Sequence, residues 1–158
     1  MAVSNRESRI VLATGNKSEL SVGYTTLYGD LVGGLAVIGD VLKSDVYRLA
    51  HFANRDGERI PINSIQKPPS AELAPGQLDS DALPPYDVLD QILVQAVELG
   101  RPLSDITPPA GVDEEKVRWV LQEVDRNEYK RRQAPLVLRV SPKAFGTGRR
   151  LPIVQRSG

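Results

Sequence analysis

The sequence predicts an α/β fold that is mostly helical and contains one to three short strands. Helices are indicated by apolar residues that recur every three to four positions in several stretches after residue 40. Strands are indicated by brief apolar runs, of which residues 9–13, RIVLA, are the clearest. A single short strand is not stable without partners, so we expect this chain to contribute to a larger α/β sheet.

The composition is typical of a globular domain and excludes several kinds of site. The chain has 158 residues, of which 41% are hydrophobic and 25% charged, enough for one domain with a core. The formal net charge is zero, so bulk charge indicates neither a nucleic-acid nor a membrane partner. The absence of cysteine excludes disulfides, thiol catalysis and cysteine-type zinc sites, and the single histidine, His51, argues against a multi-histidine metal site.

The sequence also indicates where the protein is found. Residues 1–9 are polar and lack the apolar stretch of a signal peptide. No apolar run approaches the roughly 20 residues of a membrane-spanning helix. We therefore expect a cytoplasmic protein.

The first predicted strand, residues 9–13, ends at Thr14-Gly15-Asn16. Asn16 can cap a helix, and Glu19 stands where its side chain would reach back to complete a capping box. The predicted helix runs from Glu19 to about Tyr28. Three glycines then open a loop: Gly29, Gly33 and Gly34.

The next segment, residues 35–40, LAVIGD, is expected to be a short strand or a buried turn. Asp40 is predicted to cap a second helix, whose apolar face carries Leu42, Val46, Leu49, Ala50 and Ala53. Residues 53–61 end that helix. Residues 61–85 are rich in proline, which fixes φ and removes backbone donors, so we expect a loop or linker containing one ordered piece, PPSAEL.

Helix returns at residues 86–99, where one apolar stripe contains Val88, Leu89, Ile92, Leu93 and Val97. Residues 100–112 form a loop. Asp113 is predicted to cap the last clear helix, whose buried face carries Val117, Val120, Leu121 and Val124. Residues 136–140, LVLRV, offer a further strand.

The charge of the chain is unevenly distributed. No acidic residue follows Glu128, whereas eight lysines and arginines do: Lys130, Arg131, Arg132, Arg139, Lys143, Arg149, Arg150 and Arg156. Two interpretations stay open for this basic segment. It is either a solvated tail or a segment that contacts phosphate groups.

Six longer motifs follow one another along the chain: LATGNKSELSVGYTTLYGD, VGG, KPPSAEL, LPPYDVLD, EYKRRQAP and SPKAFGTGRRLPI. Together they closely resemble the C-terminal part of the NAD+ synthetase domain, and most closely that of the long, glutamine-dependent type. The resemblance covers residues 1–158 as one portion of a domain. It implies an adenine-nucleotide α-hydrolase-like fold, which is a Rossmann-like parallel sheet with flanking helices, here represented by its mostly helical C-terminal portion.

The resemblance also implies a ligase reaction. ATP, with Mg²⁺, would adenylate the nicotinate carboxylate of deamido-NAD+ and release pyrophosphate, and ammonia would then displace AMP to give NAD+. In the long type of this family a separate glutaminase domain supplies the ammonia. A GMP-synthetase-like protein fits the KPPSAEL and YKRRQAP motifs less well.

Position by position, the resemblance implies two sets of binding residues. The ATP-binding residues would be Thr14, Lys43 and Ser70. The residues binding deamido-NAD+ would be Glu19, Tyr24, Thr25, Thr26, Leu27 and Lys130, and Glu19 would also bind the metal. Most of these residues have a simpler structural interpretation, namely a turn for Thr14, a capping box for Glu19, a plain helix face for residues 24–27, and a solvent-exposed surface or helix end for Lys43 and Lys130. Arg131 and Arg132 are weaker candidates for the same substrate.

The SGGxDS loop with which this family holds ATP phosphates does not occur in the sequence. We therefore expect a truncated chain, a fragment or one piece of a split enzyme, without synthetase activity on its own. An exposed sheet edge would favour a homo-oligomer. The alternative is a non-catalytic assembly or regulatory piece that binds a full-length synthetase.

Overall fold

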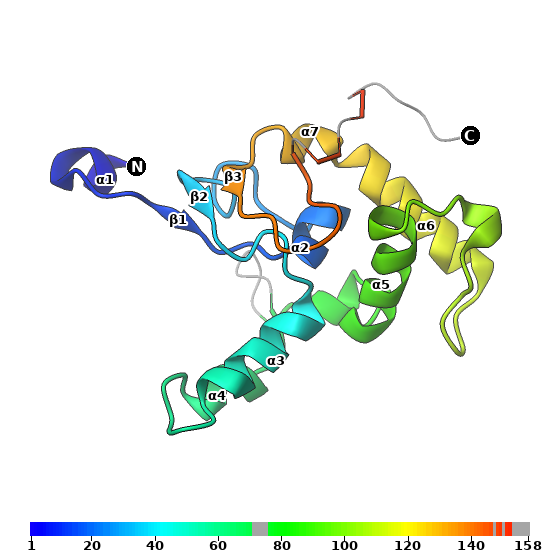
Figure 1. Cartoon of the computed structure of the whole chain (residues 1–158), viewed down its shortest axis with the longest axis horizontal. Coiled ribbons are helices and arrows are strands. Elements are labelled where there is room, and N and C mark those ends of the chain that lie inside the picture. Colours follow the sequence, from blue (N-terminus) through cyan, green and yellow to red (C-terminus); the bar gives the residue numbers. More distant parts are fainter. Residues whose placement is uncertain (71–75, 147, 150, 153–158) are drawn as a thin grey trace.

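The computed structural model describes residues 1–70, 76–146, 148–149 and 151–152 and contains a small parallel sheet beside packed helices (Figure 1). The strands are β1 (Leu12–Ala13), β2 (Leu35–Ala36) and β3 (Leu136–Val137). They lie in the order β1-β2-β3, and both neighbouring pairs are parallel. The three predicted strand segments are confirmed, although each strand is shorter than its apolar run.

The first helix, α1 (Ala2–Glu7), has no predicted counterpart. None of its residues is buried, so no apolar periodicity marks it in the sequence. It lies beyond β1, at one end of the molecule (Figure 1). No helix in the described part of the chain is long and apolar enough to cross a membrane.

Helix α2 (Lys17–Val22) begins with the predicted capping box. The Asn16 side chain accepts a hydrogen bond from the Glu19 N–H, and Glu19 Oε2 accepts one from the Asn16 N–H, both at 3.0 Å. The predicted end near Tyr28 is wrong, because Gly23 ends the helix in the left-handed conformation at φ 68°. Glycine adopts this conformation without the steric penalty that a Cβ brings.

Helix α3 (Lys43–Ala53) is not capped by Asp40, so that prediction is wrong. The Asp40 carboxylate instead accepts hydrogen bonds from the N–H groups of Val140 and Ser141, at 2.8 and 2.7 Å. The first N–H groups of α3 find other partners: that of Lys43 donates to Ser18 Oγ, and that of Ser44 to the Asp90 carboxylate.

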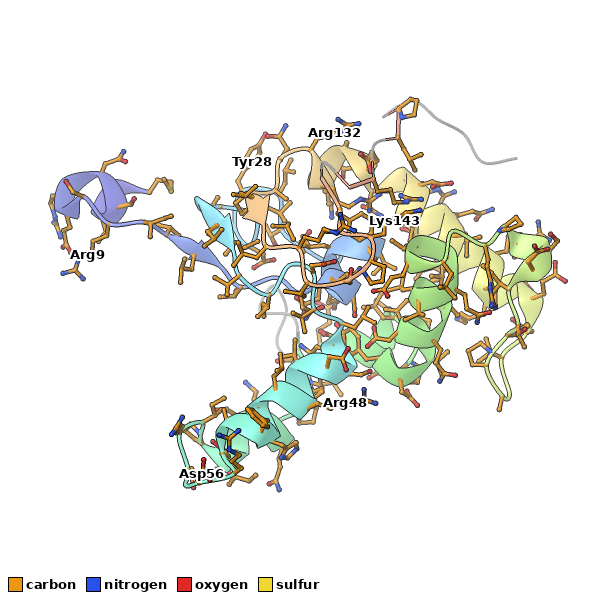
Figure 2. The ribbon with its side chains drawn as sticks, viewed as in Figure 1. Arg9, Tyr28, Arg48, Asp56, Arg132 and Lys143 are labelled. Atoms are coloured by element: carbon orange, nitrogen blue, oxygen red, sulfur yellow. The ribbon has the colours of Figure 1, made fainter. Side chains whose placement is uncertain are left out.

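Together with α4 (Ile62–Gln66), helix α3 forms an arm that projects from the body (Figure 1). The arm buries little of its predicted apolar face, since Leu49 is 51% exposed. The charged side chains of Arg48 and Asp56 point outward from it (Figure 2). His51 is exposed. Residues 71–73 of the PPSAEL motif, like Arg150 and Arg156, lie outside the described residues.

The hydrophobic core is built by two helices with the predicted stripes. Helix α5 (Tyr86–Leu93) continues into a π-helical turn, η2 (Val94–Glu98), and packs against α6 (Glu114–Arg126). The core includes Leu89, Ile92, Leu93, Val97, Val117, Val120 and Val124. Asp113 caps α6 as predicted, accepting a hydrogen bond from the Lys116 N–H at 2.8 Å. The short helices η1 (Asp79–Asp81), η3 (Leu103–Asp105) and α7 (Glu128–Arg131) complete the fold.

A buried lysine joins α2 to the C-terminal segment. Lys17 is fully buried, and its Nζ lies 2.9 Å from Asp40 Oδ1 and 2.7 Å from Glu98 Oε1. The same Nζ donates to Ser141 Oγ and to the backbone carbonyl of Lys143, the residue labelled in Figure 2. This network fixes the chain after β3 against the start of α2.

Candidate functional site

A cleft of about 610 Å³ opens beside α2. It brings together residues that are distant in the sequence, among them the predicted Thr14, Glu19, Ser70 and Lys130. The complete lining consists of Thr14, Gly15, Glu19, Gly23, Tyr24, Thr25, Thr26, Gly29, Asp30, Ser70, Gln77, Asp79 and Lys130. Most of the predicted binding residues therefore share one concave surface.

The fold places this cleft where α/β proteins usually bind ligands. Thr14 directly follows β1, and α2 begins three residues later. Ligands of open parallel sheets bind beyond the carboxyl ends of the strands, at the starts of the helices that follow. The left-handed Gly23 then turns the chain, so that Tyr24, Thr25 and Thr26 also line the cleft.

Glu19 occupies one wall of the cleft and is already engaged on both carboxylate oxygens. Oε2 completes the capping box, and Oε1 forms an ion pair with Lys43 Nζ at 3.1 Å. Lys43 is not one of the lining residues, but through this pair it stands directly behind the wall. Its Nζ also lies 5.3 Å from the centre of the Tyr86 ring, a distance at which a cation–π attraction operates.

Lys130 supports the loop that follows α2. Its Nζ donates to the backbone carbonyls of Gly23, at 2.6 Å, and Thr25, at 3.0 Å. Lys130 therefore holds the loop after α2 in place while it lines the cleft. Its neighbour Arg131 is buried and pairs with Glu128 at 3.1 Å, and Arg132 also pairs with Glu128, at 2.9 Å. For Arg131 the solvated-tail interpretation is wrong, because this residue is only 6% exposed. That burial lowers the pKa of Arg131 to about 10, although Glu128 opposes the shift.

Two hydroxyl groups of the cleft are buried without a partner. Tyr24 Oη and Thr25 Oγ1 form no hydrogen bond with any described residue. Burial raises the pKa of the Tyr24 phenol, and the nearby Asp79 and Asp81 carboxylates raise it further. Tyr24 is therefore protonated at neutral pH and can donate a hydrogen bond. Buried polar groups normally have partners, so this part of the cleft is suited to a polar ligand.

The cleft also contains three polar residues that the sequence interpretation missed, namely Asp30, Gln77 and Asp79. Asp30 Oδ2 accepts a hydrogen bond from the Thr26 N–H at 2.7 Å, and Asp79 Oδ2 accepts one from the Tyr86 hydroxyl at 2.7 Å. The only signal for Gln77 and Asp79 was the length of the proline-rich loop, since loops of this length are usually functional. Leu27, in contrast, is half-buried and does not line the cleft.

The predicted metal role of Glu19 has limited support in these side chains. Among the described residues no group of three histidine, cysteine or acidic residues is placed to hold a metal ion. Mg²⁺ takes six oxygen ligands, whereas Glu19 offers one carboxylate that is already hydrogen-bonded and paired with Lys43. The described residues alone therefore do not form a Mg²⁺ site.

Comparison with known proteins agrees with the arrangement of residues in the cleft. The family model described as NAD synthase matches residues 1–134. A glutamine-dependent NAD(+) synthetase of Synechocystis is 52% identical over 155 residues, which are 98% of this chain and 28% of that protein. One from Acinetobacter baylyi is 53% identical over 156 residues, 98% of this chain and 29% of that protein. The chain thus spans less than a third of the length of these relatives.

A solved structure agrees on the fold. The glutamine-dependent NAD(+) synthetase of Cytophaga hutchinsonii superimposes with a TM-score of 0.71 at 21% identity, covering 98% of this chain and 26% of that one. The fold is therefore adenine-nucleotide α-hydrolase-like, as expected. With the family model matching most of its length and relatives about half identical over nearly all of it, this chain belongs to the NAD synthase family.

Proposed function

We propose that this chain forms the C-terminal portion of the synthetase domain of a glutamine-dependent NAD+ synthetase, and that its cleft holds parts of ATP and deamido-NAD+. The observation that carries the proposal is the convergence of Thr14, Glu19, Ser70 and Lys130 on one cleft. Thr14 and Glu19 come from one segment and Ser70 and Lys130 from two others, and only the folded chain brings the three segments together. The names and high identity of the curated relatives support the same reaction.

The proposed reaction has two steps. The nicotinate carboxylate of deamido-NAD+ attacks the α-phosphorus of ATP, forming an acyl-adenylate and releasing pyrophosphate. Ammonia then attacks the acyl carbon, and AMP leaves with the bonding electron pair to give NAD+. Adenylation is needed because a free carboxylate is a poor electrophile. The ammonia would come from a glutaminase domain elsewhere in the full-length protein.

The residues of the cleft would share the binding of the two nucleotides. The hydroxyl groups of Thr14 and Ser70, with the Lys43 ammonium, are proposed to contact ATP. Glu19, Lys130 and the three loop residues that line the cleft, Tyr24, Thr25 and Thr26, are proposed to contact deamido-NAD+. The unpartnered hydroxyls of Tyr24 and Thr25 support the second assignment, because a ligand would supply the partners that the described residues do not.

Binding by the purified chain tests this proposal. Calorimetric titrations with ATP–Mg²⁺ and with deamido-NAD+, performed separately, are expected to give saturable binding for each. Glu19→Gln should weaken deamido-NAD+ binding at least about tenfold, because a charge-assisted hydrogen bond is lost. Glutamine still supports a capping box, so the helix should be preserved. The control is Glu115→Gln, on the exposed surface of α6.

The absence of both binding events would contradict the proposal, as would equal effects of the two glutamine variants.

A separate assay addresses activity. With ATP, deamido-NAD+ and ammonia, the chain alone is expected to form no NAD+, because its sequence has no SGGxDS loop to hold the triphosphate. A rate close to that of a full-length synthetase would contradict this expectation.

A further inference from the structure

Asp79 is a buried carboxylate on the wall of the cleft to which the assignments above give no role. It is the first residue of the short helix η1 and is only 6% exposed. Its Oδ2 accepts a hydrogen bond from the Tyr86 hydroxyl at 2.7 Å. Among the described residues it forms no ion pair with lysine or arginine. A carboxylate buried without a countercharge is costly, so its retention needs an explanation.

Tyr86 fixes the orientation of this carboxylate without neutralising it. Burial raises the pKa of the Tyr86 phenol well above its ordinary value, and the hydrogen bond to Asp79 raises it further. The phenol therefore stays protonated and keeps donating to Oδ2. Among the described residues no donor lies within 3.5 Å of the other oxygen, Oδ1, in hydrogen-bonding geometry, although the Tyr24 phenol faces the same carboxylate. Oδ1 can therefore accept a hydrogen bond from a ligand.

The surroundings of Asp79 narrow the chemistry of that ligand. Three carboxylates line the cleft, those of Glu19, Asp30 and Asp79, together with one lysine, Lys130. A phosphate group placed directly beside Asp79, which has no cationic partner among the described residues, would be repelled. The Tyr24 hydroxyl, which is buried without a partner, lines the same cleft and can both donate and accept. A carboxylate acceptor beside a phenolic hydroxyl suits a neutral group that carries adjacent hydroxyls.

We infer that Asp79 is a ligand-contacting residue whose Oδ1 accepts hydrogen bonds from the 2′,3′-diol of a nucleoside ribose, with the Tyr24 hydroxyl on the same sugar. Tyr86 is a positioning residue, because it acts on the sugar only through Asp79. This inference rests on the proposed function, in which two nucleotides enter the cleft. It adds the residue that distinguishes a ribose from a sugar lacking its hydroxyls.

The test uses neutral nucleosides, so that phosphate contacts play no part. The full chain is titrated with adenosine and with nicotinic acid riboside, each compared with its 2′,3′-dideoxy analogue. Wild type is expected to bind at least one riboside about tenfold more tightly than its analogue, the value of a hydrogen bond to a charged group. Asp79→Ala should abolish that difference and leave affinity for the analogue unchanged. The control, Asp87→Asn on the exposed face of α5, should alter neither.

Tyr86→Phe provides a second variant in case Asp79→Ala does not fold. It keeps the carboxylate but removes the group that orients it, so it should reduce the diol preference selectively. An equal loss of both the riboside and its analogue, in either variant, would overturn the inference while leaving the proposed function intact. If wild type binds no nucleoside or nucleotide, the proposed function fails together with this inference.

Discussion

Lys17 carries a positive charge in the interior, where Asp40 and Glu98 flank it at 2.9 and 2.7 Å. Lys17→Met should destabilise the chain by about 3–5 kcal/mol, because both carboxylates would remain in place without their countercharge. Chemical denaturation in urea, followed by circular dichroism, measures this change. The matched control is Lys116→Met, which removes an exposed lysine on α6 and should change stability by less than about 0.5 kcal/mol.

A small effect of Lys17→Met, comparable with that of the control, would contradict this account of the network. If the variant does not fold, Ser141→Ala gives a milder measurement, since Ser141 Oγ receives a hydrogen bond from Lys17 Nζ at 2.7 Å. The variant also removes the hydrogen bond that Ser141 Oγ donates to Asp40 Oδ1 at 2.8 Å, so it should cost about 1–3 kcal/mol. A cost of this size, or a large effect of Lys17→Met, would show that the Lys17 network stabilises the fold.

Because its pKa is lowered, Asp40 should make the free energy of unfolding depend on pH. Burial by itself raises that pKa, but hydrogen bonds from Ser141, Val140 and Lys17 more than offset this and leave it below its ordinary value. A lowered carboxyl pKa stabilises the fold above the unfolded value of about 3.9, and the contribution is lost as pH falls through the folded value. The free energy of unfolding should therefore decrease as pH falls below about 4.

Urea titrations at a series of pH values measure that slope. Asp40→Asn should be less stable than wild type at neutral pH and should show a weaker dependence on acid. Asp87→Asn, at an exposed position, should retain the wild-type slope. An unchanged slope in Asp40→Asn would mean that other carboxylates cause the loss of stability.

These residues also show what could be read from the sequence. The capping box of Asn16 and Glu19 was predictable because its partners are three positions apart, and local spacing determines the geometry. Asp40 was misassigned because its partners, Val140 and Ser141, lie about a hundred positions away. Asp79 was missed for the same reason, since only the folded chain places it beside the residues after β1.

At the scale of elements, Gly23 determines where α2 ends and where the cleft loop begins. Its φ of 68° disfavours any other residue, and a Cβ at this position would overlap the Asn127 carboxamide. Asn127 Nδ2 donates to the Val22 carbonyl at 2.9 Å, so displacing it would break a buried hydrogen bond. Gly23→Ala is therefore expected to destabilise the chain and to distort the loop of Tyr24 and Thr25.

Gly111 is a matched control that separates backbone strain from the overlap with Asn127. Gly111 has a φ of 76°, and a Cβ there would meet nothing within 4 Å. Gly111→Ala should cost about 1–2 kcal/mol from backbone strain alone. Gly23→Ala should cost about 1–3 kcal/mol more, because it adds overpacking and the lost hydrogen bond. Equal losses in the two variants, measured by urea denaturation, would contradict the predicted overlap.

Helices were predictable in proportion to how much of their surface the core covers. The stripes of α5 and α6 were read correctly because Leu89, Ile92, Val117 and Val120 repeat at helical spacing and pack together. Helix α1 was missed because it buries nothing, and α3 was correctly placed but mostly left uncovered. The π-helical turn η2 has no pattern of its own, since it continues the stripe of α5.

At the scale of the whole molecule, the sheet is small, and apolar side chains on and beside its outer strands are exposed. The three strands have two residues each, and both outer strands, β1 and β3, leave large apolar side chains exposed. Leu12 is 52% exposed on β1, and Leu136 is 67% exposed on β3. The adjoining Ile10, Leu138 and Val140 are 66%, 42% and 70% exposed. Exposed sheet edges and apolar patches of this kind favour association.

We therefore predict that the purified chain associates with itself through these outer strands as its concentration rises. Light scattering and sedimentation velocity should show an increasing mass. Leu136→Lys should reduce the association, because a lysine on an edge strand opposes pairing with another chain. Leu99→Lys replaces a side chain that is 57% exposed at the end of η2, outside the strands, and should have no effect. A monomer at every concentration, or equal effects of the two lysine variants, would rule out the outer strands as the associating surface.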